Sequence, residues 1–185
     1  MSQMADTNRR DTRMPDHDPG SYCGLYCGAC DVQAVHRRAL AEGRTARWEE
    51  LPLTMQRHLP VPKDTPVVCY GCRSDTVFGG CAKCPIRKCA RARGNIGSCP
   101  ECSRFPCLKL RVVWLVWLVG GFYRRLPHLK ATGPNLKRLW RVGTSRWLEE
   151  QRQEWTCSHC RTPLTWYTKE AHRCPPAGSP GQPLS

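Results

Sequence analysis

The feature that most constrains this chain is a recurring pair of cysteines separated by two residues. The sequence holds fourteen cysteines in 185 residues, and five C-x2-C pairs can be read in it: Cys27/Cys30, Cys69/Cys72, Cys81/Cys84, Cys99/Cys102 and Cys157/Cys160. Two residues between thiols allow a tight turn to direct both sulfurs at one ion. A disulfide framework is the alternative, but the first twenty residues are polar and lack the apolar stretch of a secretory leader. We therefore expect bound metal and a cytoplasmic location.

The distribution of apolar residues divides the chain into five parts. Residues 1–20 and 176–185 offer little to bury and are predicted to be disordered tails. Residues 21–110 form a cysteine-rich metal-binding domain, 111–134 an apolar Trp-rich connector, and 135–175 a helical segment with a zinc-ribbon-like module. A domain so poor in large apolar side chains depends on metal for stability. The predicted fold is a small, metal-stabilised, irregular α-rich (α+β) cysteine-knuckle domain followed by those two C-terminal pieces.

Helix signals lie between the cysteine groups. Asp31 is expected to cap a helix that runs to about Ala41, and Pro85 to open one that Gly94 ends. A short helical piece is expected around Trp48, with a further turn up to residue 60.

Two further helices are expected after the connector. The first starts at Asn135 and ends at Gly143, and the second restarts at Thr144 or Ser145 and runs through RWLEEQRQEW. Trp147 is expected to face inward.

The spacing of the first eleven cysteines suggests two sets of four ligands and a remainder of three. One set is Cys69, Cys72, Cys81 and Cys84, and the second is Cys89, Cys99, Cys102 and Cys107. The remainder is Cys23, Cys27 and Cys30. Its fourth ligand would be His36, a water or a substrate. Cross-braced pairing, in which alternate pairs share an ion, fits the spacings nearly as well and stays open.

Thiolate sites of this kind suit zinc or an iron–sulfur cluster. We expect several zinc ions, and the alternative is an iron–sulfur or open-site redox or catalytic centre on Cys23, Cys27 and Cys30. Their C-x3-C-x2-C spacing is that of radical-SAM enzymes, but no alternating strands and helices follow and Gly120-Gly121 lacks an acidic neighbour. No paired carboxylates, phosphate loop or single Cys/His pair stands out as catalytic, so we expect a non-enzymatic role.

The positive charge is concentrated in residues 87–148. This segment has fourteen Lys and Arg against one acidic residue, Glu101, a net charge of +13 within a formal total of +14. Such a surface can attract nucleic acid or a protein partner, while part of the charge would offset metal-bound thiolates. The apolar run 112–119 is too short to span a membrane. It is expected to be a buried strand or helix turn, with peripheral membrane contact as the alternative.

Four motifs taken in order resemble a known family. They are CGLYCGAC (23–30), CYGCRS (69–74), CAKCPIRKCA (81–90) and CPECSRFPC (99–107). Together they resemble the cysteine-rich bacterial and archaeal "domain of unknown function 3795" family, over roughly Tyr22 to Leu110. The resemblance implies metal binding through the cysteines and no established reaction.

Longer members of that family also resemble residues 135–175, with a zinc-ribbon-like end. The ribbon usually closes with a second C-x2-C, whereas here Ala171 stands at the first position of that pair. The resemblance thus implies either a shifted ligand set, Cys157, Cys160, His172 and Cys174, or an incomplete site. His159 is expected to face solvent.

Overall fold

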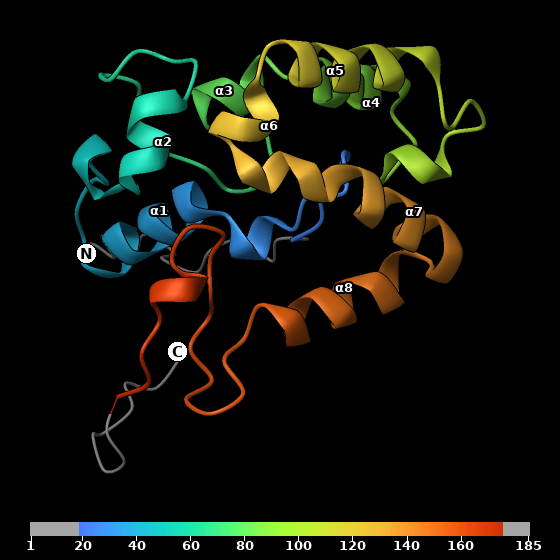
Figure 1. The fold of residues 1–185 in the computed structure, drawn as a ribbon. Helices are drawn as coiled ribbons and strands as arrows, with labels where there is room; N and C mark the ends of the chain where they lie inside the picture. The colour runs from blue at the N-terminus through green and yellow to red at the C-terminus, as the bar shows by residue number, and fades with distance from the viewer. Residues whose placement is uncertain (1–18, 176–185) are drawn as a thin grey trace, which may run out of the picture.

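The computed structural model describes residues 19–175, and that part of the chain is built from short helices (Figure 1). Its β structure consists of two isolated bridges, Gly20 with Tyr26 and Thr156 with Pro163. The α-helices are α1 Asp31–Ala41, α2 Leu53–His58, α3 Gly79–Ala82, α4 Pro85–Arg93, α5 Leu108–Val119, α6 Phe122–Arg125, α7 Thr132–Val142 and α8 Thr144–Glu154. The 3-10 turns are η1 Cys27–Ala29, η2 Trp48–Glu50, η3 Cys99–Glu101, η4 Pro127–Ala131 and η5 Lys169–Ala171. The prediction of a helix-rich fold is confirmed, whereas most of the two predicted tails lies outside the described residues.

The boundaries of α1 and α4 follow the sequence signals, with a correction at the N-terminal cap of α1. Helix α4 begins at Pro85 and stops at Gly94, which has a positive φ of 73°. Helix α1 spans the expected residues, but Cys30 is its N-cap residue and no side chain caps it. The expected cap, Asp31, is buried instead, and its carboxylate accepts a hydrogen bond of 2.5 Å from the Thr165 hydroxyl. The Asp31 side chain therefore contacts the C-terminal module and does not cap the helix.

Helices α7 and α8 form the predicted pair. Helix α7 starts at Thr132, three residues earlier than expected, and Gly143, with φ 77°, separates it from α8. Trp147 faces inward as predicted and is 1% exposed. Figure 1 shows the two helices as consecutive pieces with a turn between them.

Three small cores replace one large one. The first is formed by α1, η2, α2 and the segment 67–78. The second lies between α4, α5 and α7, and four partly buried cysteines line it together with the buried Cys23: Cys72, Cys84, Cys99 and Cys107. The third joins the 26–29 turn, α7 and α8 to the C-terminal module around Trp147 and Trp155. Cysteines therefore stand where a larger domain would place aliphatic side chains.

The Trp-rich run forms α5, and the expectation that it is buried is wrong for most of its residues. Only Leu110 and Val113 of this helix are buried, and Trp114 and Trp117 pack against the second core. The opposite face is apolar and exposed, with exposed fractions from 48% at Val112 to 78% at Val119. Within residues 19–175 no helix combines the length and apolar character needed to cross a bilayer.

Candidate metal centres

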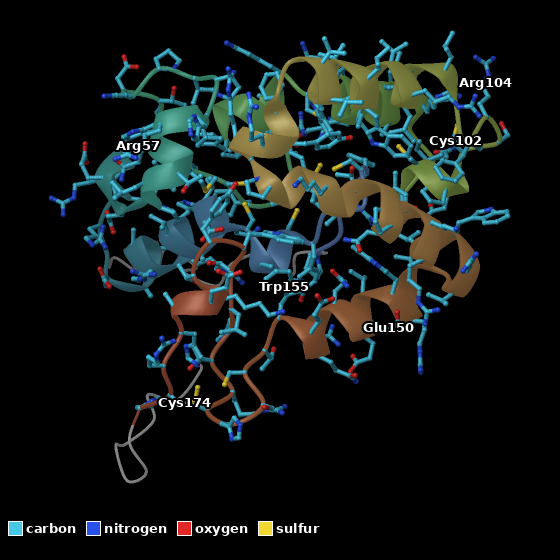
Figure 2. All side chains as sticks on the ribbon, viewed as in Figure 1. Arg57, Cys102, Arg104, Glu150, Trp155 and Cys174 are labelled. Carbon is cyan, nitrogen blue, oxygen red and sulfur yellow. The ribbon has the colours of Figure 1, made fainter. Side chains whose placement is uncertain are left out.

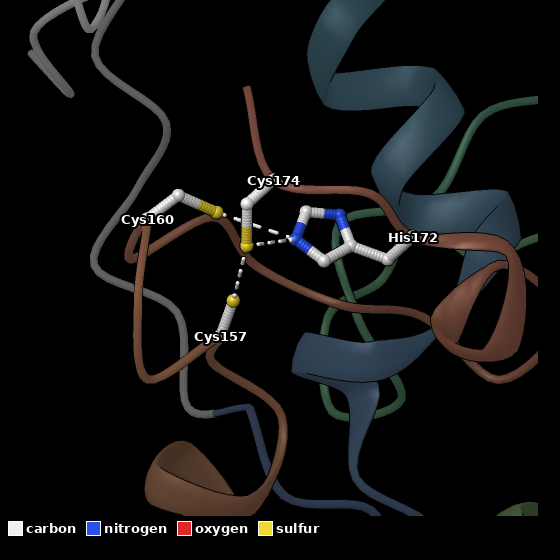
Figure 3. A group of neighbouring side chains, drawn as sticks. All are labelled: Cys157, Cys160, His172 and Cys174. Atoms are coloured by element: carbon white, nitrogen blue, oxygen red, sulfur yellow. Dashed lines mark hydrogen bonds between the residues drawn. The ribbon is translucent and has the colours of Figure 1, made fainter. Parts of the chain in front are cut away.

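Four ligand atoms near the C-terminus converge on one point (Figure 3). The sulfur, or the imidazole nitrogen Nε2, of each residue lies within 4.8 Å of all the others in the group Cys157, Cys160, His172 and Cys174. The two sulfurs of Cys157 and Cys174 are 3.5 Å apart, and Nε2 of His172 lies 3.2 Å from the Cys160 sulfur. Around a tetrahedral zinc the ligand sulfurs stand about 3.8 Å apart, because each Zn–S bond is about 2.3 Å. The cluster therefore has the dimensions of a site for one metal ion.

A tight turn presents the first two ligands. The Cys157 amide donates to the Thr162 carbonyl (3.0 Å), and the Arg161 amide donates back to the Cys157 carbonyl (3.0 Å). This closure forces Arg161 to a φ of 61°, the left-handed region that favours glycine. His159 lies inside the turn, is exposed as predicted, and is not part of the ligand group.

Hydrogen bonds lower the pKa of the Cys160 thiol. The Thr162 hydroxyl and amide lower the pKa of Cys160 to about 6, and amide groups of Cys160 and His159 lower the pKa of Cys157. The pKa of His172 is raised by hydrogen bonds to the Cys157 and Cys160 sulfurs. Thiolate and neutral imidazole are the forms that bind metal, so the shifts of Cys157 and Cys160 favour binding, whereas the raised pKa values of His172 and of Cys174, about 11, favour their protonated forms.

Polar contacts hold the C-terminal module against the N-terminal domain at Ala29 and Asp31, and a further one joins it to His128 of the connector. The Trp166 amide donates to the Ala29 carbonyl (3.1 Å), Thr165 donates to Asp31, and His128 Nδ1 lies 2.7 Å from the Tyr167 hydroxyl. The labelled Trp155 in Figure 2 lies between α8 and this module. These contacts tie the metal cluster to the loop that carries the first cysteines.

Two glycines of CGLYCGAC are explained by packing. Gly24 has φ 82°, and a Cβ there would approach the Leu136 side chain to 3.0 Å. The Gly24 carbonyl also accepts a hydrogen bond of 2.8 Å from the Asn135 amide. At Gly28 a Cβ would lie 2.4 Å from the Tyr26 ring. The two glycines are therefore required by contacts with α7 and with Tyr26. The sequence motif alone does not indicate these contacts.

Three of the four C-x2-C pairs in the N-terminal domain share one backbone hydrogen bond. In each of the three pairs Cys27/Cys30, Cys81/Cys84 and Cys99/Cys102 the amide of the second cysteine donates to the carbonyl of the first, at 3.0–3.1 Å. Cys30 and Cys84 then serve as N-cap residues of α1 and α4. The predicted tight turn between paired thiols is thus present in the backbone.

The thiols of the opening loop face those of the second and third motifs. Burial, and next the neighbouring thiol of Cys69, raises the pKa of Cys30 to about 12. Burial, then the thiols of Cys23 and Cys84, raises the pKa of Cys72 to about 12. His36, one predicted fourth ligand, is buried, and its Nδ1 accepts the amide proton of Cys69 (3.3 Å). The thiols of the opening loop therefore lie near thiols of the later motifs, and which of them would share an ion stays a prediction.

The second predicted set of four cysteines lines one cavity. Cys89, Cys99, Cys102 and Cys107 surround a space of about 30 Å³ together with apolar side chains of α4 and α5. Burial, followed by the thiols of Cys23 and Cys107, raises the pKa of Cys99 to about 12. Within residues 19–175, however, the C-terminal cluster is the one group of three or more ligand atoms gathered within 4.8 Å. The metal roles of the eleven N-terminal cysteines stay predictions.

A comparison with protein-family models finds a match over half of the chain. The model described as "Protein of unknown function (DUF3795)" covers residues 20–112. The chain belongs to this family. No curated protein and no solved structure matches it.

The DUF3795 region and the C-terminal cluster occupy different parts of the chain. All eleven N-terminal cysteines fall inside the matched residues 20–112, while the gathered ligands at 157–174 lie outside them. In this DUF3795 protein, Ala29 and Asp31 of the family region contact the module that carries the cluster. Sequence reasoning missed those two contact residues, because neither contact is visible in a local pattern.

Proposed function

We propose that this chain is a non-enzymatic zinc-binding protein whose C-terminal module is held in shape by one zinc ion. The observation that supports the proposal is the convergence of three cysteine sulfurs and one imidazole nitrogen within 4.8 Å. A Cys₃His set is typical of structural zinc, because such sites fill all four positions with protein ligands. Catalytic zinc keeps one position for water or substrate, and a four-ligand set leaves none. The ion would stabilise the module rather than carry out chemistry.

Two histidines allow a matched test of this proposal. The full chain and the variants His172→Ala and His159→Ala are purified, and their zinc content is measured after competition with a chelator. His172→Ala is expected to lose zinc affinity by more than about tenfold, since it removes a ligand. His159→Ala is the control, because its side chain is exposed and outside the ligand group. Equal zinc retention by the two variants would refute the proposed ligand set.

We also propose that the chain binds an anionic membrane surface through the outer face of α5. The face is a continuous apolar stripe at helical spacing, formed by Leu108, Val112, Leu115, Val116 and Val119, which are 48–78% exposed. Exposed apolar area of this kind marks an interaction site. Trp114 and Trp117 of the same helix pack against the second core, so they are not part of this stripe.

The charges around α5 favour a lipid surface over nucleic acid. Lys109 and Arg111 flank the stripe on its two sides, and Arg124 and Arg125 follow in α6; all four are exposed. No acidic residue occurs between residues 102 and 148. An apolar helix face rimmed by cations fits the boundary between acyl chains and anionic headgroups, whereas the phosphates of nucleic acid offer nothing to an aliphatic stripe. Part of the basic charge counted in the sequence serves the fold, since Arg87 donates to the Cys72 and Ser74 carbonyls.

Cosedimentation with vesicles tests the membrane proposal. The chain is expected to bind phosphatidylserine-containing vesicles and not neutral phosphatidylcholine vesicles. A double change, Leu115→Glu with Val119→Glu, is expected to abolish binding, while Leu53→Glu on α2, at a 66% exposed position, is the control. If vesicle binding is absent and salt-sensitive binding of DNA or RNA survives the double change, the basic segment serves nucleic acid and the proposal is wrong.

A further inference from the structure

The cavity between α4, η3 and α5 is walled by cysteines that come from three different segments. Cys89 lies on α4, Cys99 and Cys102 bound the η3 turn, and Cys107 is the N-cap residue of α5. The labelled Cys102 in Figure 2 lies on the turn beside α5. All four thiols line the same cavity of about 30 Å³. The fold therefore collects four potential ligands that span nineteen residues of sequence.

The spacing of these thiols differs from that of the C-terminal cluster. A single tetrahedral zinc requires all four sulfurs about 3.8 Å from one another. Within residues 19–175 the C-terminal ligand atoms all lie within 4.8 Å of one another, and no three of the cavity thiols do. A cavity of about 30 Å³ is also roughly twice the minimum that holds one water. The site is thus wider than one ion needs.

The rest of the lining suits a negatively charged inorganic centre shielded from water. Ile86, Ile96, Phe105 and Leu110 supply an apolar wall, and Arg93 and Lys109 are the cationic members of the lining. The Arg93 side chain makes a hydrogen bond to Cys89 and is attracted to Cys102 and Cys107. Cations and donors near ligand sulfurs stabilise the net negative charge of a metal–thiolate centre.

The turn that carries two of the thiols is held by hydrogen bonds to neighbouring segments. The Cys99 amide donates to the Tyr22 carbonyl (3.0 Å), and the Glu101 carboxylate accepts hydrogen bonds from the Gly97 amide and the Ser98 hydroxyl. The Thr144 hydroxyl at the start of α8 donates to the same carboxylate. The positions of Cys99 and Cys102 are therefore set by contacts with other parts of the fold.

We propose that Cys89, Cys99, Cys102 and Cys107 bind an iron–sulfur cluster in this cavity. Several irons and sulfides lie between the cysteine ligands of such a cluster, so its ligand sulfurs stand further apart than those around one zinc. The sequence alternative centred the cluster on Cys23, Cys27 and Cys30, and the proposal moves it to this cavity. It uses none of the C-terminal ligands, so it stands or fails independently of the zinc proposal.

Anaerobic purification of the full chain, with iron and sulfide supplied, tests the proposal. We expect a brown protein with broad visible absorbance and about two or four irons, matched by acid-labile sulfide, per chain. Cys102→Ser and Cys107→Ser are each expected to lose that absorbance and iron while they keep the C-terminal zinc. Cys160→Ser is the matched control and should keep the iron while it loses zinc.

Alkylation mapping covers the case in which a serine variant fails to fold. In the loaded wild-type chain, the four cavity thiols should resist alkylation, and removal of iron by a chelator should expose all four together. A colourless chain that holds only zinc after anaerobic loading would overturn the proposal. The proposal would also be overturned if both serine variants still bound iron, or if the four thiols were alkylated in the loaded chain.

Discussion

Lowering the pH from 7 to 5 is expected to weaken the fold through His128. Its ring lies between η4 and the C-terminal module, with Nδ1 2.7 Å from the Tyr167 hydroxyl and the Trp166 ring centroid 6.3 Å away. Burial lowers the pKa of His128 from 6.5 to about 4, so the folded protein holds the neutral imidazole. Because the folded pKa is depressed for this base, the unfolded chain binds the proton more readily. Stability is then full above pH 6.5 and is lost as the pH falls from 6.5 towards 4.

The magnitude follows from linkage between protonation and folding. With pKa values of 6.5 unfolded and about 4 folded, the penalty at pH 7 is only about 0.2 kcal/mol and at pH 5 it reaches about 2 kcal/mol. This is an upper limit, because the ring is partly exposed and solvent screens part of its charge. The loss is expected to fall on the docking of the C-terminal module.

The assay compares variants, because acid also releases metal from thiolates. Denaturant unfolding is followed by tryptophan fluorescence at pH 7 and pH 5 for the wild type, His128→Gln and His58→Gln. The wild type and His58→Gln, whose side chain is exposed, should lose up to about 2 kcal/mol more than His128→Gln over this range. An equal loss in all three proteins, or a measured pKa near 6.5 for His128, would refute the reasoning.

Three further predictions concern the C-terminal module and its support. Arg161→Gly should raise the free energy of unfolding by about 1 kcal/mol, since glycine accepts φ 61° without strain; a lower denaturation midpoint would contradict this. Thr165→Val should cost about 1–3 kcal/mol in chemical denaturation, because the buried Asp31 carboxylate loses a donor, and an unchanged midpoint would show that water replaces it. Trp147→Ala should cost about 3–5 kcal/mol in thermal or chemical unfolding, because the side chain is 1% exposed, and a loss below about 1 kcal/mol would show that the third core is not continuous.

Local sequence signals were sufficient for helices α1, α4, α7 and α8, apart from the first turn of α7. Proline at the start of α4, glycine at its end and Gly143 between α7 and α8 each act within a few residues, so their effect does not depend on the rest of the fold. The same holds for the turns inside the pairs Cys27/Cys30, Cys81/Cys84 and Cys99/Cys102. The expectation for the run 112–119 failed because an apolar sequence indicates surface to cover but not which molecule covers it.

The spacing of cysteines in the sequence predicted the metal-ligand groups only in part. The resemblance offered Cys157, Cys160, His172 and Cys174 as one of two alternatives, and the structure brings their ligand atoms together. Among the first eleven cysteines, spacing separated Cys23, Cys27 and Cys30 from the later motifs, whereas the thiols of Cys30 and Cys69 are neighbours in space. The spacing between two cysteines describes the geometry of one turn. Whether two turns bind the same ion depends on whether the tertiary fold brings their thiols together.

By itself the sequence determined that this is a short-helix protein rich in paired cysteines, related to the DUF3795 family, with its positive charge in residues 87–148. Only the tertiary structure decided which thiols face one another, that Asp31 supports the C-terminal module, and that α5 presents an apolar face outward. The physical reason is the difference in sequence separation over which these interactions act. Turn and helix preferences act over a few residues, but burial and ligand grouping depend on contacts between segments as distant as Asp31 and Thr165.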